Sequence, residues 1–342
     1  MNRDRRTRAP RAKATALVLA LLAALFAACT RGASEEPAAE IDPFETAGDQ
    51  PLDPLPLEVD FDPARVALGE KLFRERLLSG DGKIACSDCH KQEHGLADYG
   101  AQSSVEGRPA TAVNTPGMYN ARYLFRFNWG GRFETLEEHN DALMKNPNVM
   151  ASSWERAAQN LAGRPDYQTA FREVFGDGIT PGNVRTALLE YERSLITPNA
   201  PFDRYLRGDK DAISPEARRG FALFKDYGCA SCHQGAAVGG NMLQRFGVMR
   251  DYFADRGDVK PPDFGRFNVT AREEDRFVFR VPSLRNVALT APYFHDGSAP
   301  TLERAVAVMA RYQLGRELEP DEVSRIVAFL GTLSGEYRGQ EP

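Results

Sequence analysis

A five-residue pattern, C-x-x-C-H, occurs twice in this chain and constrains its fold more than any other feature. Two thiols at this spacing can each form a thioether with one vinyl group of a haem. The histidine that follows then lies beneath the iron as an axial ligand. Two covalently bound c-type haems are therefore expected. The first motif contains Cys86, Cys89 and His90, and the second contains Cys229, Cys232 and His233.

Zinc sites and thioredoxin-like redox centres also use C-x-x-C pairs. Zinc would need the four sulfurs to converge on one ion, but the two pairs lie 143 residues apart and each has its own histidine. The haem interpretation is therefore preferred for both motifs.

The N-terminus has the pattern of a bacterial export signal. Six basic residues between positions 3 and 13 precede an apolar run at 14–28, which is short for a membrane span. Residues 26–29 (FAAC) resemble the site at which lipoproteins are cleaved and acylated, and Cys29 is the one cysteine outside the haem motifs. We expect residues 1–28 to be a lipoprotein-type signal peptide, with export to the periplasm and membrane attachment only through a lipid on Cys29. An uncleaved anchor or an ordinary signal peptide is the alternative.

The charge of the chain excludes some partners. The formal net charge is −5 for the whole sequence and becomes about −10 without residues 1–28. Such an acidic protein is not expected to bind nucleic acid, and its surface is compatible with a basic electron-donor protein. The roughly 310 residues that remain are enough for two domains.

Two related halves follow a segment with no predicted fold. Residues 29–60 are rich in Pro, Glu, Ala and Asp and are expected to form a flexible tether. Asp62-Pro63 and Ser214-Pro215 are typical helix starts, and each leads through a G-x-x-L-F sequence to a haem motif. The repeat predicts an N-terminal haem domain at 61–200, a C-terminal haem domain at 201–335 and a tail at 336–342.

Helical spacing of apolar residues dominates the rest of the chain. It is present between the haem motifs, at 153–163, 166–175 and 182–196, and it returns at 301–311 and from 320 onward. No segment alternates strongly in the manner of a strand. We therefore predict a mostly α fold.

The remaining axial positions decide the function. Two haems have four axial sites, and His90 and His233 fill two of them. His94, His139, His295 and the methionines are candidates for the others. An iron with two strong protein ligands transfers electrons, whereas an iron with a free face can bind peroxide or oxygen. His94 is expected to be exposed in a loop, and His139 is expected on the polar surface of a helix.

Three C-terminal segments, 280–286 (RVPSLRN), 289–297 (LTAPYFHDG) and 308–315 (VMARYQLG), resemble bacterial di-haem cytochrome c peroxidases. The resemblance covers roughly residues 61–334. It implies two cytochrome c-like haem domains packed against each other. It also implies that the first haem reacts with peroxide and that the second haem, of higher potential, accepts electrons.

The resemblance also implies roles for single residues. Met309 matches the methionine that ligates the second iron opposite His233, and His295 matches a residue that supports this haem without ligating it. Trp129, in the segment 128–132 (NWGGR), matches a tryptophan that lies between the two haems. A side-chain amide and two backbone carbonyls would hold a calcium ion between the domains. These calcium ligands would come from Asn114, Thr290 and Pro292.

Two positions depart from the family pattern. Glu106 replaces a histidine that closes the resting active site in many relatives. The first iron is then either open, as in the related MauG-type enzymes, or bound by a weak carboxylate or water ligand. Val149 replaces the glutamate that moves a proton during peroxide cleavage, which valine cannot do. His139 could face the first haem and take over that proton transfer, so Trp129, Glu106 and His139 are the catalytic candidates.

Three functions remain open at this point. The preferred one is a periplasmic peroxidase that reduces hydrogen peroxide with electrons from a small redox protein, a cytochrome c or a cupredoxin. The second is a MauG-like oxidase that acts on a protein substrate, although MauG-type proteins have tyrosine where Met309 stands. The third is a non-catalytic di-haem electron carrier or redox sensor, which Val149 supports. Members of the family often form dimers, so a homodimer is a further expectation.

Overall fold

The computed structural model describes residues 50–104 and 109–337 of the chain. The predicted signal peptide, Cys29, most of the predicted tether, Glu106 and residues 338–342 lie outside the described residues. The described part is mostly helical, as predicted, and its sheet consists of two strands of three residues each. Within these ranges, no helix has both the length and the hydrophobicity that a membrane span requires.

In the N-terminal half, helices pack around a shared apolar core that includes Leu72, Phe171 and Leu188. The helices are α2 (Pro63–Phe73), α3 (Leu136–Lys145), α4 (Trp154–Ala162), α5 (Pro165–Phe175) and α6 (Pro181–Ser194). The predicted start of α2 is present: Asp62 accepts hydrogen bonds from two backbone N–H groups, and Pro63 takes the first helical position.

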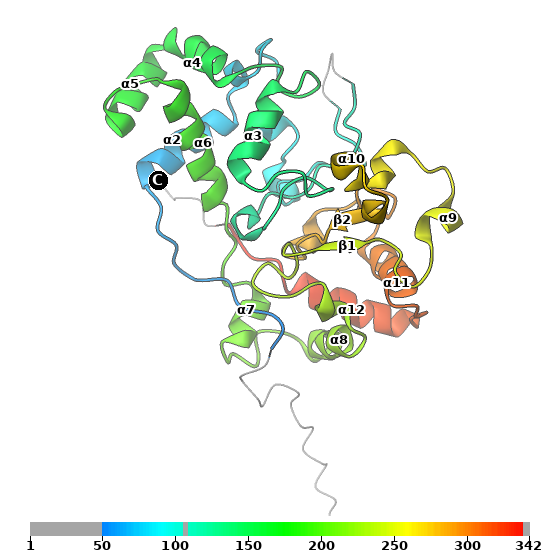
Figure 1. Cartoon of the computed structure of the whole chain (residues 1–342). Coiled ribbons are helices and arrows are strands. Elements are labelled where there is room, and N and C mark those ends of the chain that lie inside the picture. The colour runs from blue at the N-terminus through cyan, green and yellow to red at the C-terminus, as the bar shows by residue number, and fades with distance from the viewer. Residues whose placement is uncertain (1–49, 105–108, 338–342) are drawn as a thin grey trace, which may run out of the picture. The chain divides into compact units, whose positions relative to one another are not determined.

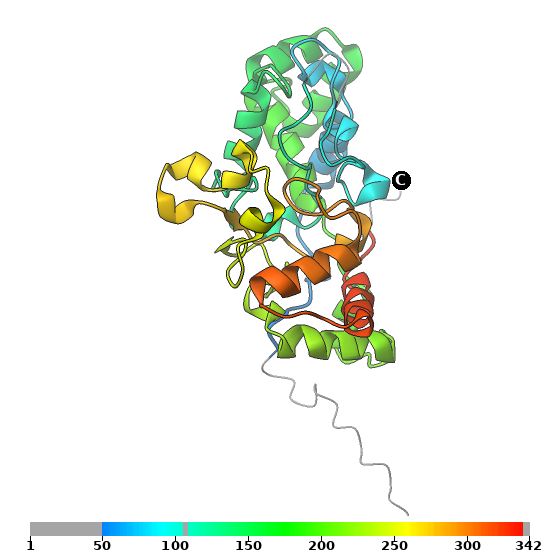
Figure 2. The same cartoon turned by 90° about the vertical axis from the view of Figure 1, so that its right-hand side faces the viewer.

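In the C-terminal half, aromatic rings dominate the core. The elements are α7 (Pro201–Leu206), α8 (Pro215–Asp226), β1 (Leu243–Arg245), α9 (Tyr252–Arg256), α10 (Phe267–Thr270), β2 (Val278–Arg280), α11 (Leu302–Gln313) and α12 (Pro320–Gly331). Phe202 of α7 lies edge-on to Phe221 of α8 and to Phe329 of α12, with ring centroids 4.7 and 5.0 Å apart. β1 and β2 pair antiparallel. Figures 1 and 2 show α2 and α4–α6 at one end of the described residues and α7, α8 and α12 at the other.

The two G-x-x-L-F sequences have the same structural role. A Cβ atom on Gly69 would lie 2.0 Å from the carbonyl oxygen of Ala187, and one on Gly220 would lie 1.9 Å from that of Arg325. Both glycines therefore let two helices cross at close range, α2 with α6 and α8 with α12. The internal repeat in the sequence corresponds to a repeated helix crossing.

Part of the predicted tether is folded. Leu52 and Leu55 are buried, and the Leu55 N–H donates to the Asp203 carboxylate at 3.2 Å. Arg207 donates to the Leu55 carbonyl oxygen. The prediction of a flexible segment is therefore wrong for residues 50–56, because two buried leucines are enough to hold this polar stretch against the C-terminal half.

The C-terminal end also folds back. Tyr337, the last described residue, packs against Tyr119 with ring centroids 5.8 Å apart and joins the N-terminal core. The predicted tail therefore begins no earlier than residue 338.

Candidate functional site

The first C-x-x-C-H motif is held in a short turn. Cys86–Asp88 form a 3-10 helix, the Asp88 carboxylate accepts from the Ala85 N–H at 2.9 Å, and the His90 N–H donates to the Cys86 carbonyl oxygen at 3.0 Å. His90 Nδ1 donates to the Leu96 carbonyl oxygen at 2.6 Å. Because a carbonyl can only accept, Nδ1 carries the proton and Nε2 is left as a metal ligand.

The second motif repeats this conformation. Cys229–Ser231 form a 3-10 helix, and the His233 N–H donates to the Cys229 carbonyl oxygen at 3.0 Å. Burial lowers the pKa of His233 to about 4, so its imidazole is neutral, as a metal ligand must be. A Cβ on Gly239 would lie 3.1 Å from His233 Nδ1, so glycine is needed where the chain passes this ring.

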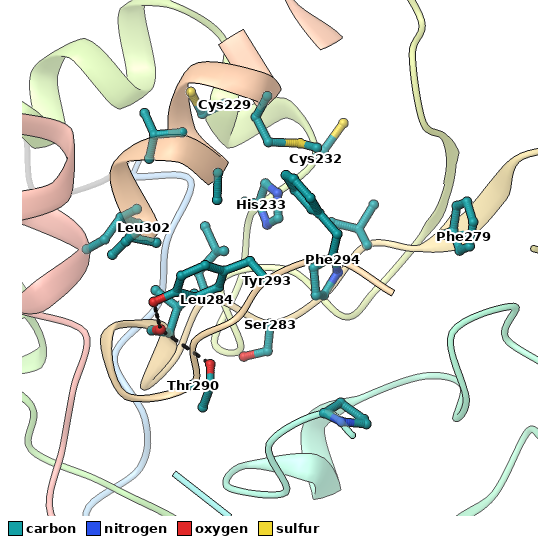
Figure 3. A pocket seen from close by; sticks show the side chains of 18 of the residues that line it. Cys229, Cys232, His233, Phe279, Ser283, Leu284, Thr290, Tyr293, Phe294 and Leu302 are labelled. Carbon is teal, nitrogen blue, oxygen red and sulfur yellow. Dashed lines mark hydrogen bonds between the residues drawn. The ribbon is translucent and has the colours of Figure 1, made fainter. Parts of the chain in front are cut away.

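A cavity of about 270 Å³ opens beside the second motif. Its walls include Cys229, Cys232, His233 and, from α11, Met309. Figure 3 shows the two cysteines and His233 grouped together, with the ring of Phe294 close to them. The structure thus brings to one cavity the two thiols and both side chains that were predicted to ligate the second iron.

Arg280 supports the presence of an anionic group in this cavity. Its side chain is buried and lines the cavity, and its Nε and Nη1 atoms have no hydrogen-bond partner in the described part of the chain. Burial lowers its pKa to about 10. A buried, unpaired cation is costly, and a haem propionate would neutralise it. Arg280 opens the segment 280–286, and nothing in that sequence alone indicates this role.

Trp129 and His295 lie on the wall of the same cavity. The Trp129 indole N–H donates to the Asn114 carbonyl oxygen at 2.8 Å, and its ring meets that of His295 edge-on at 6.4 Å. His295 is buried, and its Nε2 lies 2.6 Å from the Asp263 carboxylate. Because this nitrogen is hydrogen-bonded to Asp263, it is not free to ligate an iron, and His295 is therefore suited to a supporting role. Arg256 pairs with Asp263 and Asp296, so these acids form an ion network with a cation already in it.

The three predicted calcium ligands also meet here. Asn114 comes from the N-terminal half and Thr290 and Pro292 from the C-terminal half, and all three line the cavity. The Asn114 side-chain N–H donates to the Gly100 carbonyl oxygen at 3.2 Å, which leaves its amide oxygen as the atom for a cation.

His139 is less exposed than expected. The ring is half-buried and packs against Phe127 and Phe133, with centroids 6.0 and 5.6 Å apart. Burial lowers its pKa to about 4, and positive charge on His90 and Arg280 acts in the same direction. His139 is therefore a neutral imidazole within electrostatic range of the first haem ligand. Two neighbouring glutamates made the helix look wholly polar, but Leu136 and Asn140, three before and one after His139, are buried.

Glu192 is a buried acid that the sequence analysis missed. It lies on α6 and is 4% exposed, and its carboxylate accepts from the Asn140 side chain at 2.7 Å. Burial raises its pKa to about 7, and its charge acts on Cys86 of the first motif. Its spacing from Leu188 and Leu195, both buried, is the signal that could have placed it on the apolar face of the helix.

The structure also shows the surroundings of His94, Val149 and Met249. His94 is part-buried, contrary to expectation, because its Nε2 donates to the Ala291 carbonyl oxygen at 2.6 Å. Val149 packs against the N-terminal core. Met249, another of the candidate methionines, is 60% exposed and does not line the cavity beside the second motif.

Comparison with known proteins identifies relatives along most of the chain. Residues 63–211 match the family described as di-haem cytochrome c peroxidase. The chain is 41% identical to cytochrome c551 peroxidase of Nitrosomonas europaea over 85% of this chain and 86% of that protein. It is 40% identical to cytochrome c peroxidase Ccp of Escherichia coli over 84% of this chain, but it spans only 62% of that protein's length.

A solved structure of a MauG-like protein associated with microbial copper homeostasis has a similar fold. Its TM-score is 0.72 at 25% identity, and the match covers 84% of this chain and 94% of that one. The predicted fold, mostly α with two cytochrome c-like haem domains, is confirmed, and so is the predicted resemblance.

Proposed function

Because the chain belongs to the family of di-haem cytochrome c peroxidases, we propose that it reduces hydrogen peroxide to water with electrons from a small redox protein. The compartment in this proposal is the periplasm, which the export signal supports. The observation that carries the proposal is the half-buried imidazole of His139, which packs against Phe127 and Phe133, is neutral at pH 7 and lies within electrostatic range of His90, since peroxide cleavage needs a group that moves a proton.

Electrons arrive at the second haem site, where His233 and Met309 are the two ligands. Support comes from their position on one cavity, which the unpaired Arg280 also lines. A thioether ligand favours the reduced state of iron, which suits a centre that accepts electrons. Trp129, held by its bond to the Asn114 carbonyl, is the aromatic group on the route toward the first site.

Proton transfer takes place in the N-terminal half, at the site of the first haem motif. A haem bound through Cys86, Cys89 and His90 supplies the redox chemistry at this site. His139 accepts a proton from peroxide at one ring nitrogen and returns it to the departing oxygen. Glu192 holds Asn140, the neighbour of His139, and thereby fixes this face of α3. Val149 then needs no acid function, and the lack of a histidine at position 106 is compatible with a first iron that peroxide can reach.

The remaining parts of the proposal concern assembly. Asn114, Thr290 and Pro292 hold a calcium ion between the two halves, because they supply oxygen atoms from both. A lipid on Cys29 keeps the protein at the membrane, and a homodimer is the proposed oligomer. The donor is a cytochrome c or a cupredoxin.

Purified protein with both haems, a reduced donor and hydrogen peroxide tests the main proposal. Stopped-flow absorption should show donor oxidation coupled to peroxide loss, and the oxidised protein should give a high-spin signal in electron paramagnetic resonance. Turnover no faster than that of free haem would exclude the peroxidase assignment.

A MauG-like oxidation of a protein partner is the second candidate, and the similarity to the MauG-like structure favours it. Mass spectrometry of candidate periplasmic partners after peroxide exposure distinguishes the two functions. Oxidised or cross-linked aromatic residues in a partner are expected only for the MauG-like function.

A further inference from the structure

Tyr227 occupies an unusual position between the second haem site and the surface. It ends α8, two residues before Cys229, and its side chain is one wall of the cavity. Its hydroxyl donates to the carboxylate of Glu322 on α12, and the guanidinium of Arg316 lies over its ring, 4.8 Å from the centroid. Tyr227 therefore lies at the wall of the haem cavity, and its hydroxyl contacts an ionisable group on a partly exposed helix turn.

The other tyrosines of the cavity lack such a partner in the described residues. Tyr293 is buried and donates its hydroxyl to the Val287 carbonyl oxygen at 3.0 Å. Tyr119 packs against Tyr337. A backbone carbonyl cannot take up a proton, whereas a carboxylate can. Tyr227 is thus the cavity tyrosine whose hydroxyl has a proton acceptor within hydrogen-bond reach.

We infer that Tyr227 is a redox-active residue that passes single electrons from the surface to the second haem, with its phenolic proton moving to Glu322. This inference rests on the proposed peroxidase function, which supplies the oxidant. Reduction of one hydrogen peroxide to two waters takes up two electrons and two protons and leaves the protein two electrons short. When no donor protein is bound, Tyr227 supplies one of these electrons, and a neutral tyrosyl radical and a protonated Glu322 result.

The charges around Tyr227 favour this coupled transfer. A cation over the ring opposes a positively charged ring, so Arg316 disfavours loss of an electron without loss of the proton. The bond to Glu322 raises the pKa of Tyr227, and the same bond lowers the pKa of Glu322. At neutral pH the proton is therefore on the phenol and the carboxylate is free to receive it. Asp226 and Arg325 are the other charged groups that act on this pair.

Tyr312 provides a matched control. Its hydroxyl also donates to a surface carboxylate, that of Asp255 at 3.2 Å, and Arg311 lies over its ring at 5.6 Å. Tyr312 packs in the same cluster as Met309 but does not line the haem cavity, so it has similar local chemistry without a place on the cavity wall. A difference between the two tyrosines then reports on direct contact with the cavity.

The experiment exposes the di-haem protein to hydrogen peroxide without a donor and freezes it for electron paramagnetic resonance. A parallel sample receives a nitroso spin trap and is digested for mass spectrometry. Wild-type protein should give a tyrosyl radical and a trap adduct on Tyr227. Tyr227→Phe should lose most of both, Glu322→Gln should weaken both, and Tyr312→Phe should retain them.

Haem absorption is recorded in every sample, together with haem content and thermal unfolding of each variant. If peroxide changes the haem spectrum but the radical persists in Tyr227→Phe or the adduct maps to Tyr312, the inference is overturned and the peroxidase function stands. If peroxide leaves the haem spectrum unchanged, both are overturned, since no oxidant then reaches Tyr227. Glu322→Gln keeps the ring in place and decides the question even if Tyr227→Phe is poorly folded.

Discussion

In both halves a short 3-10 helix carries the two cysteines, and the histidine that follows donates its N–H to the carbonyl of the first cysteine at 3.0 Å. The surroundings of the two motifs differ. Near the first lie two titratable side chains, the half-buried His139 and the buried Glu192. Around the second lie aromatic rings, Met309 and the buried cation Arg280. The same attachment motif thus lies beside titratable side chains in the first half and beside aromatic rings and a buried cation in the second.

The buried acids of the two halves differ in the same sense. Glu192 in the first half is bonded to a neutral amide, that of Asn140. Asp203 in the second half pairs with Arg285 at 2.7 Å, with both side chains fully buried. Glu192 therefore has a neutral hydrogen-bond partner, whereas Asp203 has a cationic one.

The largest expected effect comes from His139. His139→Ala should lower kcat/KM for peroxide by about 10²–10⁴-fold, because it removes a half-buried base near the first motif that is neutral at pH 7. Steady-state turnover with a reduced donor measures the effect. Glu138→Ala, on the exposed face of the same helix, is the control and should retain activity. Equal activity of His139→Ala and wild type would remove the proton-handling role from this half.

The second-largest expected effect comes from breaking the buried ion pair between Asp203 and Arg285. Asp203→Asn should destabilise the protein by about 3–5 kcal/mol, because it leaves Arg285 buried with two backbone carbonyl partners and without the carboxylate that balances its charge. Urea unfolding of the di-haem protein at pH 7 measures this. Asp209→Asn, which removes an exposed acid 3.9 Å from Arg204, should change stability by less than about 1 kcal/mol. A stable Asp203→Asn variant would mean that the pair contributes little.

The sequence predicted the features that neighbouring residues determine. The helix starts at Asp62-Pro63 and Ser214-Pro215 are present, because a cap and a proline act within one turn. The C-x-x-C-H motifs and the cavity position of Met309 also agree with expectation, since fixed spacings carry them. The fold class followed from helical periodicity.

Features that depend on packing between distant segments were missed or wrong. His139 was expected at the surface because Glu137 and Glu138 are polar, but Phe127 and Phe133 cover it from another loop. Nε and Nη1 of Arg280 lack hydrogen-bond partners among the described residues because of how the cavity is assembled, and the residues next to Arg280 in the sequence do not reveal this. Residues 50–56 looked like linker, and only the contact with Asp203 shows why they are folded.

The third prediction asks whether the two helix crossings are equivalent. Gly69→Ala and Gly220→Ala should each destabilise the protein by about 1–3 kcal/mol, because a Cβ at either position meets a carbonyl oxygen of the facing helix. Denaturant unfolding of both variants measures this. Gly163→Ala, whose nearest atom would be 3.8 Å away, should be neutral. A large effect at one crossing and none at the other would show that the repeat is not structurally equivalent.

The smallest expected effect is the dependence of the free energy of unfolding on pH that Glu192 causes. Burial raises the pKa of Glu192 to about 7, whereas an unfolded glutamate has a pKa of about 4.3. Between these values the native protein holds a proton that the unfolded chain has lost. Wild-type stability should therefore fall as pH rises through this window, by about 2 kcal/mol from pH 5 to pH 8, and then level off.

Glu192→Gln removes this dependence, since glutamine cannot ionise and its side-chain oxygen can still accept from Asn140. The variant should be more stable than wild type at pH 8 but not at pH 5. Urea unfolding at several pH values will measure the difference. Removing charge then stabilises the first half above neutral pH, whereas Asp203→Asn destabilises the second half at pH 7. Parallel stability curves for Glu192→Gln and wild type would mean that Glu192 stays ionised in the native protein, and the proposed contrast between the two buried acids would fail.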